Sequence, residues 1–193
     1  MSPVAKERLG KAALTLWLPV TLAIVASLMV SHVVAMPSPT DGARLRDGVS
    51  ALRRGDGAFR LHVLYERCSC TRSLWAHLME RGAQAGVDEL ILYVGADPER
   101  AAEARRRGYR FARRTPEALS ETLGLDAAPL FVVAEDEIAY VGGYYALPAA
   151  VDPRDEAIVR ALADGERVAP LPIYGCAVSP ALQDQVDPLG LVY

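Results

Sequence analysis

The sequence predicts an α/β domain, a layered sandwich built around a mixed β-sheet. Helical patterns alternate with short apolar runs along most of the chain, and this alternation favours strands covered by helices. An acidic turn at residues 135–137 separates two apolar runs and predicts an antiparallel hairpin, which makes the sheet mixed. The 193 residues, 51% of them hydrophobic, suffice for one domain with a core of ordinary size.

Several predicted helices are bounded by residues that physically favour a helix end. Thr115 and Pro116 combine a capping side chain with proline at the first helical position, and Gly124 ends that helix. Asp97 and Pro98 open another helix in the same way. In chain order we expect a helix at 43–54, a strand at 59–65, a helix ending near 81, a strand at 87–95, a helix to 107, a short strand at 109–113, a helix at 116–123, strands at 129–133 and 138–141, a helix opening at 152–153 and a short helix at 179–186.

The N-terminal segment has a composition of its own. Residues 12–36 contain no Asp, Glu, Lys or Arg, and about 20 apolar residues suffice to span a bilayer. Lys6, Arg8 and Lys11 precede this stretch, and positive charge tends to stay in the cytoplasm. We therefore expect a single-pass transmembrane helix with its N-terminus cytoplasmic and the domain extracytoplasmic. The alternative is a signal peptide cleaved near 33–35, which would also export the domain to an oxidising compartment.

The charge of the chain argues against a nucleic-acid partner, and its composition divides it into segments. The net charge of -3 and the pI near 5.7 give no reason to expect nucleic acid as a partner. The arginine-rich run at 105–114 is interpreted as a solvated surface. The predicted segments are an N-terminal membrane anchor at 1–36, a linker and weak helix at 37–56, the domain at 57–167 and a proline-punctuated C-terminal extension at 168–193.

Two cysteines separated by one residue, Cys68 and Cys70, lie between a predicted strand and a predicted helix. The positive end of a helix dipole favours thiolate over thiol, and Arg67 and Arg72 would add positive potential. This placement predicts redox or soft-metal chemistry rather than a purely structural role. A disulfide that encloses a single residue is geometrically constrained, so a closed Cys68–Cys70 bond should be relatively oxidising.

These motifs together resemble the thioredoxin-like superfamily. Cys68-Ser69-Cys70 occupies the place of the family's Cys-x-x-Cys between strand and helix, residues 127–133 are similar to its cis-proline loop and following strand, and residues 135–143 resemble its hairpin and glycine. The resemblance covers about residues 57–165. More narrowly, the chain is similar to membrane-anchored bacterial proteins that carry Cys-x-Cys, which implies a periplasmic domain.

The resemblance implies a function and a set of site residues. The function is thiol–disulfide exchange with a protein or small-molecule partner, without a bound cofactor or metal. Cys68 would be the nucleophile and Cys70 its resolving partner, while Pro129 would be cis and would shape the substrate groove with Ala128. The departure from Cys-x-x-Cys leaves open which sulfur attacks first and what the redox potential is.

Cys176 leaves further alternatives open. It is either a third redox thiol, if the C-terminal extension folds back, or a buried small residue beside Gly175. Thiolates also suit Cu(I), so a Cu(I)-binding metallochaperone of the same fold is an alternative function. That function would need Cys176 as third ligand, because His62 precedes the cysteines on a strand and His77 lies inside the helix. A redox-inactive binding module is the remaining alternative.

Overall fold

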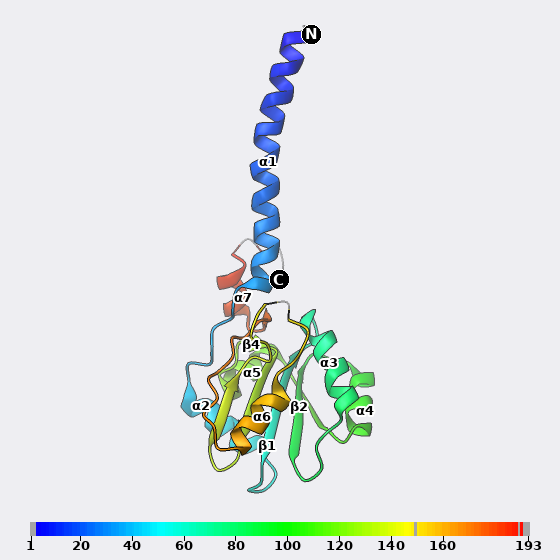
Figure 1. Ribbon diagram of the computed structural model, residues 1–193, viewed down its shortest axis with the longest axis vertical. Helices are drawn as coiled ribbons and strands as arrows, with labels where there is room; N and C mark the ends of the chain where they lie inside the picture. Colours follow the sequence, from blue (N-terminus) through cyan, green and yellow to red (C-terminus); the bar gives the residue numbers. More distant parts are fainter. Residues whose placement is uncertain (1–2, 149, 189, 191–193) are drawn as a thin grey trace.

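Within residues 3–148, 150–188 and 190, which a computed structural model of the chain describes, a five-stranded sheet of order β3-β2-β1-β5-β6 forms the centre (Figure 1). The strands are β1 (Phe59–Tyr65), β2 (Asp88–Val94), β3 (Arg110–Arg114), β4 (Ala127–Ala128), β5 (Leu130–Ala134), β6 (Ile138–Gly142) and β7 (Cys176–Ala177). The helices are α1 (Pro3–Val33), α2 (Gly42–Leu52), α3 (Cys70–Arg81), α4 (Pro98–Arg106), α5 (Pro116–Leu123), α6 (Asp155–Ala163) and α7 (Pro180–Val186).

The sheet is mixed, as the sequence predicts. β1 pairs parallel with β2, and β2 pairs parallel with β3. β5 runs antiparallel to β1, and β6 returns antiparallel to β5 through the predicted acidic turn. The short strand near residues 109–113 is confirmed as β3, at the edge of the sheet.

Helices cover both faces of the sheet and bury a hydrophobic cluster on each. α3 and α6 lie on one face, and α2 and α5 lie on the other (Figure 1). Successive residues of β1 point to opposite faces, so Leu61 and Val63 join the cluster beneath α2 and α5, whereas Leu64 joins the cluster beneath α3. The result is the three-layer arrangement that the sequence predicts.

Two details differ from the sequence-based expectation. The last helix of the sheet domain, α6, begins at Asp155 rather than at 152–153, and Arg154 is its N-cap. The paired strands β4 and β7, of two residues each, were not predicted. Segments this short carry no measurable hydrophobic period, so only their position in the fold can reveal them.

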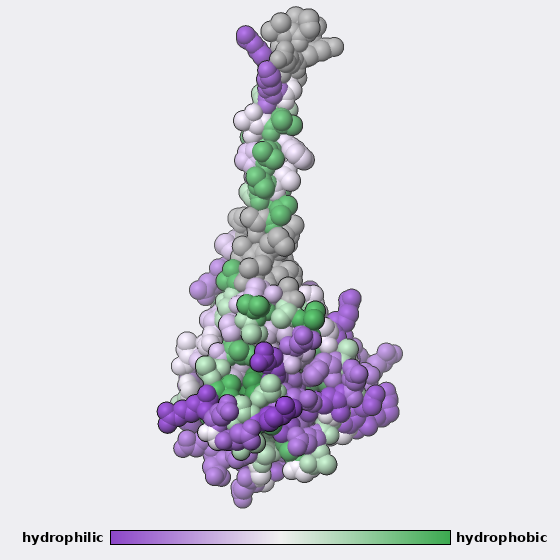
Figure 2. Space-filling model, in the orientation of Figure 1, coloured by the Kyte–Doolittle hydropathy of each residue, from purple (hydrophilic) through white to green (hydrophobic). Residues whose placement is uncertain are grey.

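The N-terminal segment forms α1, which projects away from the sheet domain (Figure 1). Large apolar side chains along its described part are exposed, including Leu16 at 70% and Trp17 at 62% (Figure 2). The sequence predicts a transmembrane helix in this segment. That prediction is not supported, because no helix in the described part of the chain has both the length and the sustained apolar character needed to cross a bilayer.

Charged side chains are buried between the sheet and the helices α3 and α6. The carboxylate of Glu89 on β2 accepts hydrogen bonds from Arg60 at 2.8 Å and from Arg81 at 2.9 Å. Arg81 also lies 3.6 Å from Asp155 on α6, and Asp155 in turn pairs with His77 at 2.9 Å. This network connects the C-terminal end of α3 to the sheet and to α6. It therefore helps to fix the position of α3 on the sheet.

His62 adds a neutral side chain to the same network. It is completely buried, with Nδ1 at 2.7 Å from the Tyr144 hydroxyl and Nε2 at 3.7 Å from the Glu89 carboxylate. Burial lowers the pKa of His62, and the nearby Glu89 offsets this only in part. Burial alone would raise the pKa of Glu89, but its interactions with His62 and Arg81 outweigh burial and lower it to about 2.

The Glu89 shift predicts an acid-sensitive fold. Because its pKa is depressed in the folded state, the stability that Glu89 contributes is present above the unfolded value of 4.5 and is lost as the pH falls towards about 2. We expect Glu89→Gln to lower the free energy of unfolding at neutral pH by on the order of 3 kcal/mol, because the buried Arg60 and the partly buried Arg81 lose their carboxylate partner. Urea denaturation followed by circular dichroism measures this effect.

The matched control is Glu80→Gln, since Glu80 is exposed on α3. The control should leave stability unchanged, and Glu89→Gln should flatten the loss of stability in acid. His62 should contribute an earlier decline as the pH falls through about 6.5, where its unfolded form takes up a proton. Equal behaviour of the two glutamate variants would contradict the assignment of this network.

Candidate active site

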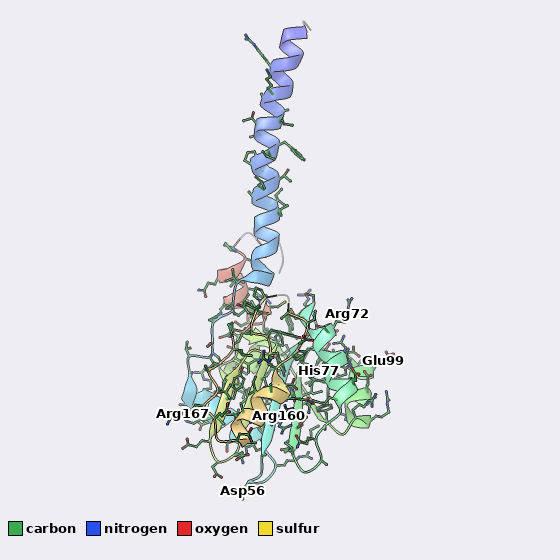
Figure 3. All side chains as sticks on the ribbon, viewed as in Figure 1. Asp56, Arg72, His77, Glu99, Arg160 and Arg167 are labelled. Carbon is green, nitrogen blue, oxygen red and sulfur yellow. The ribbon has the colours of Figure 1, made fainter. Side chains whose placement is uncertain are left out.

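Cys68 and Cys70 lie where β1 gives way to α3, as the sequence predicts. The Cys68 N–H donates to the Tyr65 carbonyl at 3.1 Å, and the buried Thr71 hydroxyl donates to the same carbonyl at 2.8 Å. Cys70 is the first residue of α3. Figure 3 labels Arg72 at this end of the domain, the end nearer to α1, and shows the loop residue Asp56 at the opposite end.

The two thiols differ in their access to solvent. Cys68 is only 3% exposed, and its sulfur lies 3.8 Å from the Ala128 carbonyl oxygen. Cys70 is half-buried at the beginning of the helix. Of this pair, Cys70 is therefore the residue with more access to solvent.

The loop before β5 forms a wall against Cys68. The Ala128–Pro129 peptide bond is cis, as the resemblance implies, and both residues are buried. Since the Ala128 carbonyl faces the Cys68 sulfur, this loop and the start of α3 form one continuous site.

Cys176 belongs to the same site although it lies near the end of the chain. β7 pairs antiparallel with β4, in a register that places Cys176 opposite Ala128. Cys176 is 7% exposed, and Cys176 and Cys70 both lie close enough to the Cys68 thiol to raise its pKa. The C-terminal extension thus folds back and brings the third cysteine to the site of the other two.

This arrangement of cysteines changes the acid–base behaviour that the sequence suggests for Cys68. Hydrogen bonding to Cys176 and to Cys70, together with burial, raises the pKa of Cys68. The helix dipole was expected to lower it. However, Cys68 precedes the N-cap Ser69, and the Thr71 N–H, in the first turn of α3, donates to the Cys68 carbonyl rather than to its thiol. Cys68 therefore keeps its proton in this arrangement.

Tyr145 is a neighbour of the cysteines that the sequence did not single out. Burial raises the pKa of Tyr145, Ser73 opposes that shift, and Cys70 and Cys68 lie close enough to raise the pKa further. In the sequence, Tyr145 could have been noticed because Tyr144 and Tyr145 directly follow the two glycines at the end of the hairpin. Its position beside the site depends on the tertiary fold, which the sequence does not show.

Other residues considered from the sequence are engaged elsewhere. The Glu66 carboxylate accepts a hydrogen bond from the Ala96 N–H at 2.9 Å, in the loop after β2. His62 contacts Tyr144 and His77 contacts Asp155. Within the described residues, no group of three or more His, Cys, Asp or Glu side chains is arranged to hold a metal ion. Cys176 does lie near Cys68, as the copper-carrier alternative requires, but the described residues show no such ligand arrangement to support it further.

The architecture is consistent with the thioredoxin-like fold that the sequence resembles. A mixed sheet lies between two helical layers, a cysteine pair begins the helix after β1, and a cis proline precedes β5. The protein has a fold similar to that in the crystal structure of an uncharacterized conserved protein from Geobacillus kaustophilus, with a TM-score of 0.50 and 15% identity over 76% of this chain and 92% of that chain.

A solution structure of a thioredoxin-like protein in the oxidized form is more distantly similar. Its TM-score is 0.46 and its identity 12%, covering 67% of this chain and 97% of that chain. The chain matches no protein-family model and no curated protein sequence.

The difference in access predicts an order of thiol reactivity. In the reduced, folded protein we expect iodoacetamide to modify Cys70 roughly tenfold or more faster than Cys68 or Cys176, because both of those sulfurs are covered and Cys68 is held protonated. Timed alkylation followed by peptide mass mapping gives the three rates. Denatured protein is the control, in which the rates should converge, and faster labelling of Cys68 in the folded protein would contradict the described geometry.

Proposed function

We propose that this protein is a thiol–disulfide oxidoreductase that acts through Cys68 and Cys70. The observation that carries the proposal is the adjacency of the two sulfurs at the start of α3, against the loop that contains the cis proline. The partner is a protein or a small molecule that carries a thiol or a disulfide. This chemistry passes electrons between sulfur atoms and requires no bound organic cofactor.

The exposure of the two sulfurs favours Cys70 as the one that meets the partner. The resemblance assigned first attack to Cys68, but in the described arrangement Cys68 is covered and its pKa is raised by hydrogen bonding and burial. Cys70 is half-exposed and occupies the first position of α3, where the helix dipole favours a thiolate. Cys68 is then the resolving thiol.

The exchange can be written with every atom balanced. The Cys70 thiolate attacks one sulfur of a partner disulfide, that S–S bond breaks, and the departing thiolate takes up a proton. The Cys68 sulfur then attacks Cys70, displaces the second partner thiolate and loses its own proton to it. The partner disulfide has gained two electrons and two protons, and Cys68 and Cys70 have lost them. In the reverse direction the protein oxidises a partner dithiol.

The resemblance implies that Pro129 and Ala128 shape the substrate groove, but we propose that they position Cys68 instead. Both are buried, and β7 already pairs with the backbone of Ala128. The partner therefore approaches Cys70 from the exposed start of α3, and the Ala128–Pro129 loop positions Cys68 from behind.

Substitution of each cysteine tests this assignment. We expect Cys70→Ser to lower the rate of oxidised glutathione reduction by about a hundredfold or more, because the attacking sulfur is lost. Cys68→Ser should instead accumulate a mixed disulfide between glutathione and Cys70, visible by intact mass, because the assigned resolving thiol is lost. Ser50→Ala, an exposed change on α2, which covers the other face of the sheet, is the control. Exchange that persists in the Cys68→Ser, Cys70→Ser double variant would show that the activity resides elsewhere.

We also propose that the domain works outside the cytoplasm, in the periplasm. The support is the run of uncharged residues at 12–36 that follows basic residues, a pattern that leads to export whether or not the segment is later removed. Three cysteines clustered for redox exchange suit an oxidising compartment.

A reporter fusion tests the location. Alkaline phosphatase, which becomes active only after export, is joined to the C-terminus of the full chain and expressed in bacteria. We expect activity with the full chain and about tenfold less when residues 1–36 are deleted, because the basic and apolar residues that direct export are then lost. Equal activity of the two fusions, or no activity of either at matched protein levels, would contradict an exported domain.

A further inference from the structure

We propose that Cys176 is a third redox residue and that the stable oxidised form of the protein holds a Cys68–Cys176 disulfide, with Cys70 returned to the thiol. The proposal rests on the thiol exchange proposed above and names the internal end point of that exchange. It is carried by the way the C-terminal segment is fixed against the loop between β4 and β5.

Backbone hydrogen bonds hold Cys176 in register with this loop. In the antiparallel β4–β7 pair, Cys176 lies opposite Ala128, and Ala177 lies opposite Ala127. The pairing continues beyond the strand, because the Val178 N–H donates to the Asp126 carbonyl at 2.6 Å. Cys176 therefore approaches the same residue, Ala128, whose carbonyl oxygen lies 3.8 Å from the Cys68 sulfur.

Gly175 permits this close approach. A Cβ atom at position 175 would collide with the Ala128 carbonyl and with the Pro129 ring, so the backbones touch directly at this point. No larger residue could occupy position 175 without a shift of either the loop or the C-terminal segment.

The helix α7 fixes the other end of β7. The Gln183 side-chain amide donates to the carbonyl of Ala177 at 3.2 Å and to that of Val178 at 3.3 Å. The Ser179 side chain caps the helix by accepting a hydrogen bond from the Leu182 N–H at 3.3 Å. Cys176 is thus held from both sides and is not the mobile residue of a loose tail.

The proximity of Cys68 to both other cysteines supplies the chemical argument. Cys70 follows it by two residues at the start of α3, and Cys176 lies opposite Ala128, whose carbonyl oxygen is 3.8 Å from the Cys68 sulfur. A disulfide between Cys68 and Cys70 must close around a single residue, which constrains its geometry, whereas Cys176 reaches Cys68 from a separate strand.

The internal step balances without an additional reagent. Cys176 attacks the Cys68 sulfur of a Cys68–Cys70 disulfide, the Cys68–Sγ to Cys70–Sγ bond breaks, and the proton of Cys176 passes to Cys70. Cys70 is a good leaving group, because a thiolate at the first position of α3 is stabilised by the helix dipole. Over the whole sequence, Cys68 and Cys176 lose two electrons and two protons, and the partner disulfide gains them.

Disulfide mapping of the wild-type full chain tests the proposal directly. The reduced protein is equilibrated with oxidised glutathione, free thiols are blocked with N-ethylmaleimide, and the digested peptides are identified by mass. We expect a peptide linked through Cys68 and Cys176, with Cys70 carrying the maleimide. A Cys68–Cys70 link with Cys176 blocked would overturn the inference and leave the proposed function intact. Three blocked thiols with no glutathione reduced would overturn both.

Variants provide a second readout. At a fixed ratio of reduced to oxidised glutathione, Cys176→Ser should lower the equilibrium constant for internal disulfide formation by about tenfold or more, because only the constrained one-residue ring remains. Gly175→Ala should shift the equilibrium in the same direction while keeping all three sulfurs. Gly57→Ala is its control, because nothing lies within 4 Å of a Cβ at position 57. An equilibrium in Cys176→Ser equal to that of the wild type would contradict the proposal.

Discussion

A short antiparallel strand pair, in which Ala128 lies opposite Cys176, brings the third cysteine of this protein to the other two. The rest of the site depends on that contact, because the Ala128 carbonyl also lies against the Cys68 sulfur. With β7 in place, Cys68 is covered and its pKa is raised, so it behaves as a protected thiol rather than as an exposed nucleophile. The same contact leaves Cys70 as the accessible sulfur.

The position of α3 depends on a second and deeper set of interactions. Glu89 joins Arg60 and Arg81 beneath the helix, and Asp155 connects Arg81 to α6. Such buried pairs add little net stability relative to a well-packed apolar core, but losing one partner leaves the other charge uncompensated. The network is thus better understood as a constraint on how α3 and α6 sit on the sheet, with the cysteines at the far end of α3.

Much of the fold could be predicted because its signals are local. Thr115 with Pro116 and Asp97 with Pro98 start helices by capping chemistry that operates within a few residues. The strand-to-helix position of Cys68 and Cys70 follows from periodicity alone. The transmembrane prediction for the N-terminal segment, which rested on the absence of charge at residues 12–36, was not supported by α1 as described.

The amino-acid sequence alone determined the mixed sheet, its helices and a cysteine pair at a helix start, since each rests on patterns within short stretches of chain. Tertiary structure alone decided which sulfur is covered and where Cys176 lies. Cys176 meets Ala128 through two backbone residues on each strand, too few for a hydrophobic period, and the two partners are distant in sequence. That distant contact contributes to the burial of Cys68 and places Cys176 beside it. Both effects raise the pKa of Cys68, whereas the local helix dipole was expected to lower it.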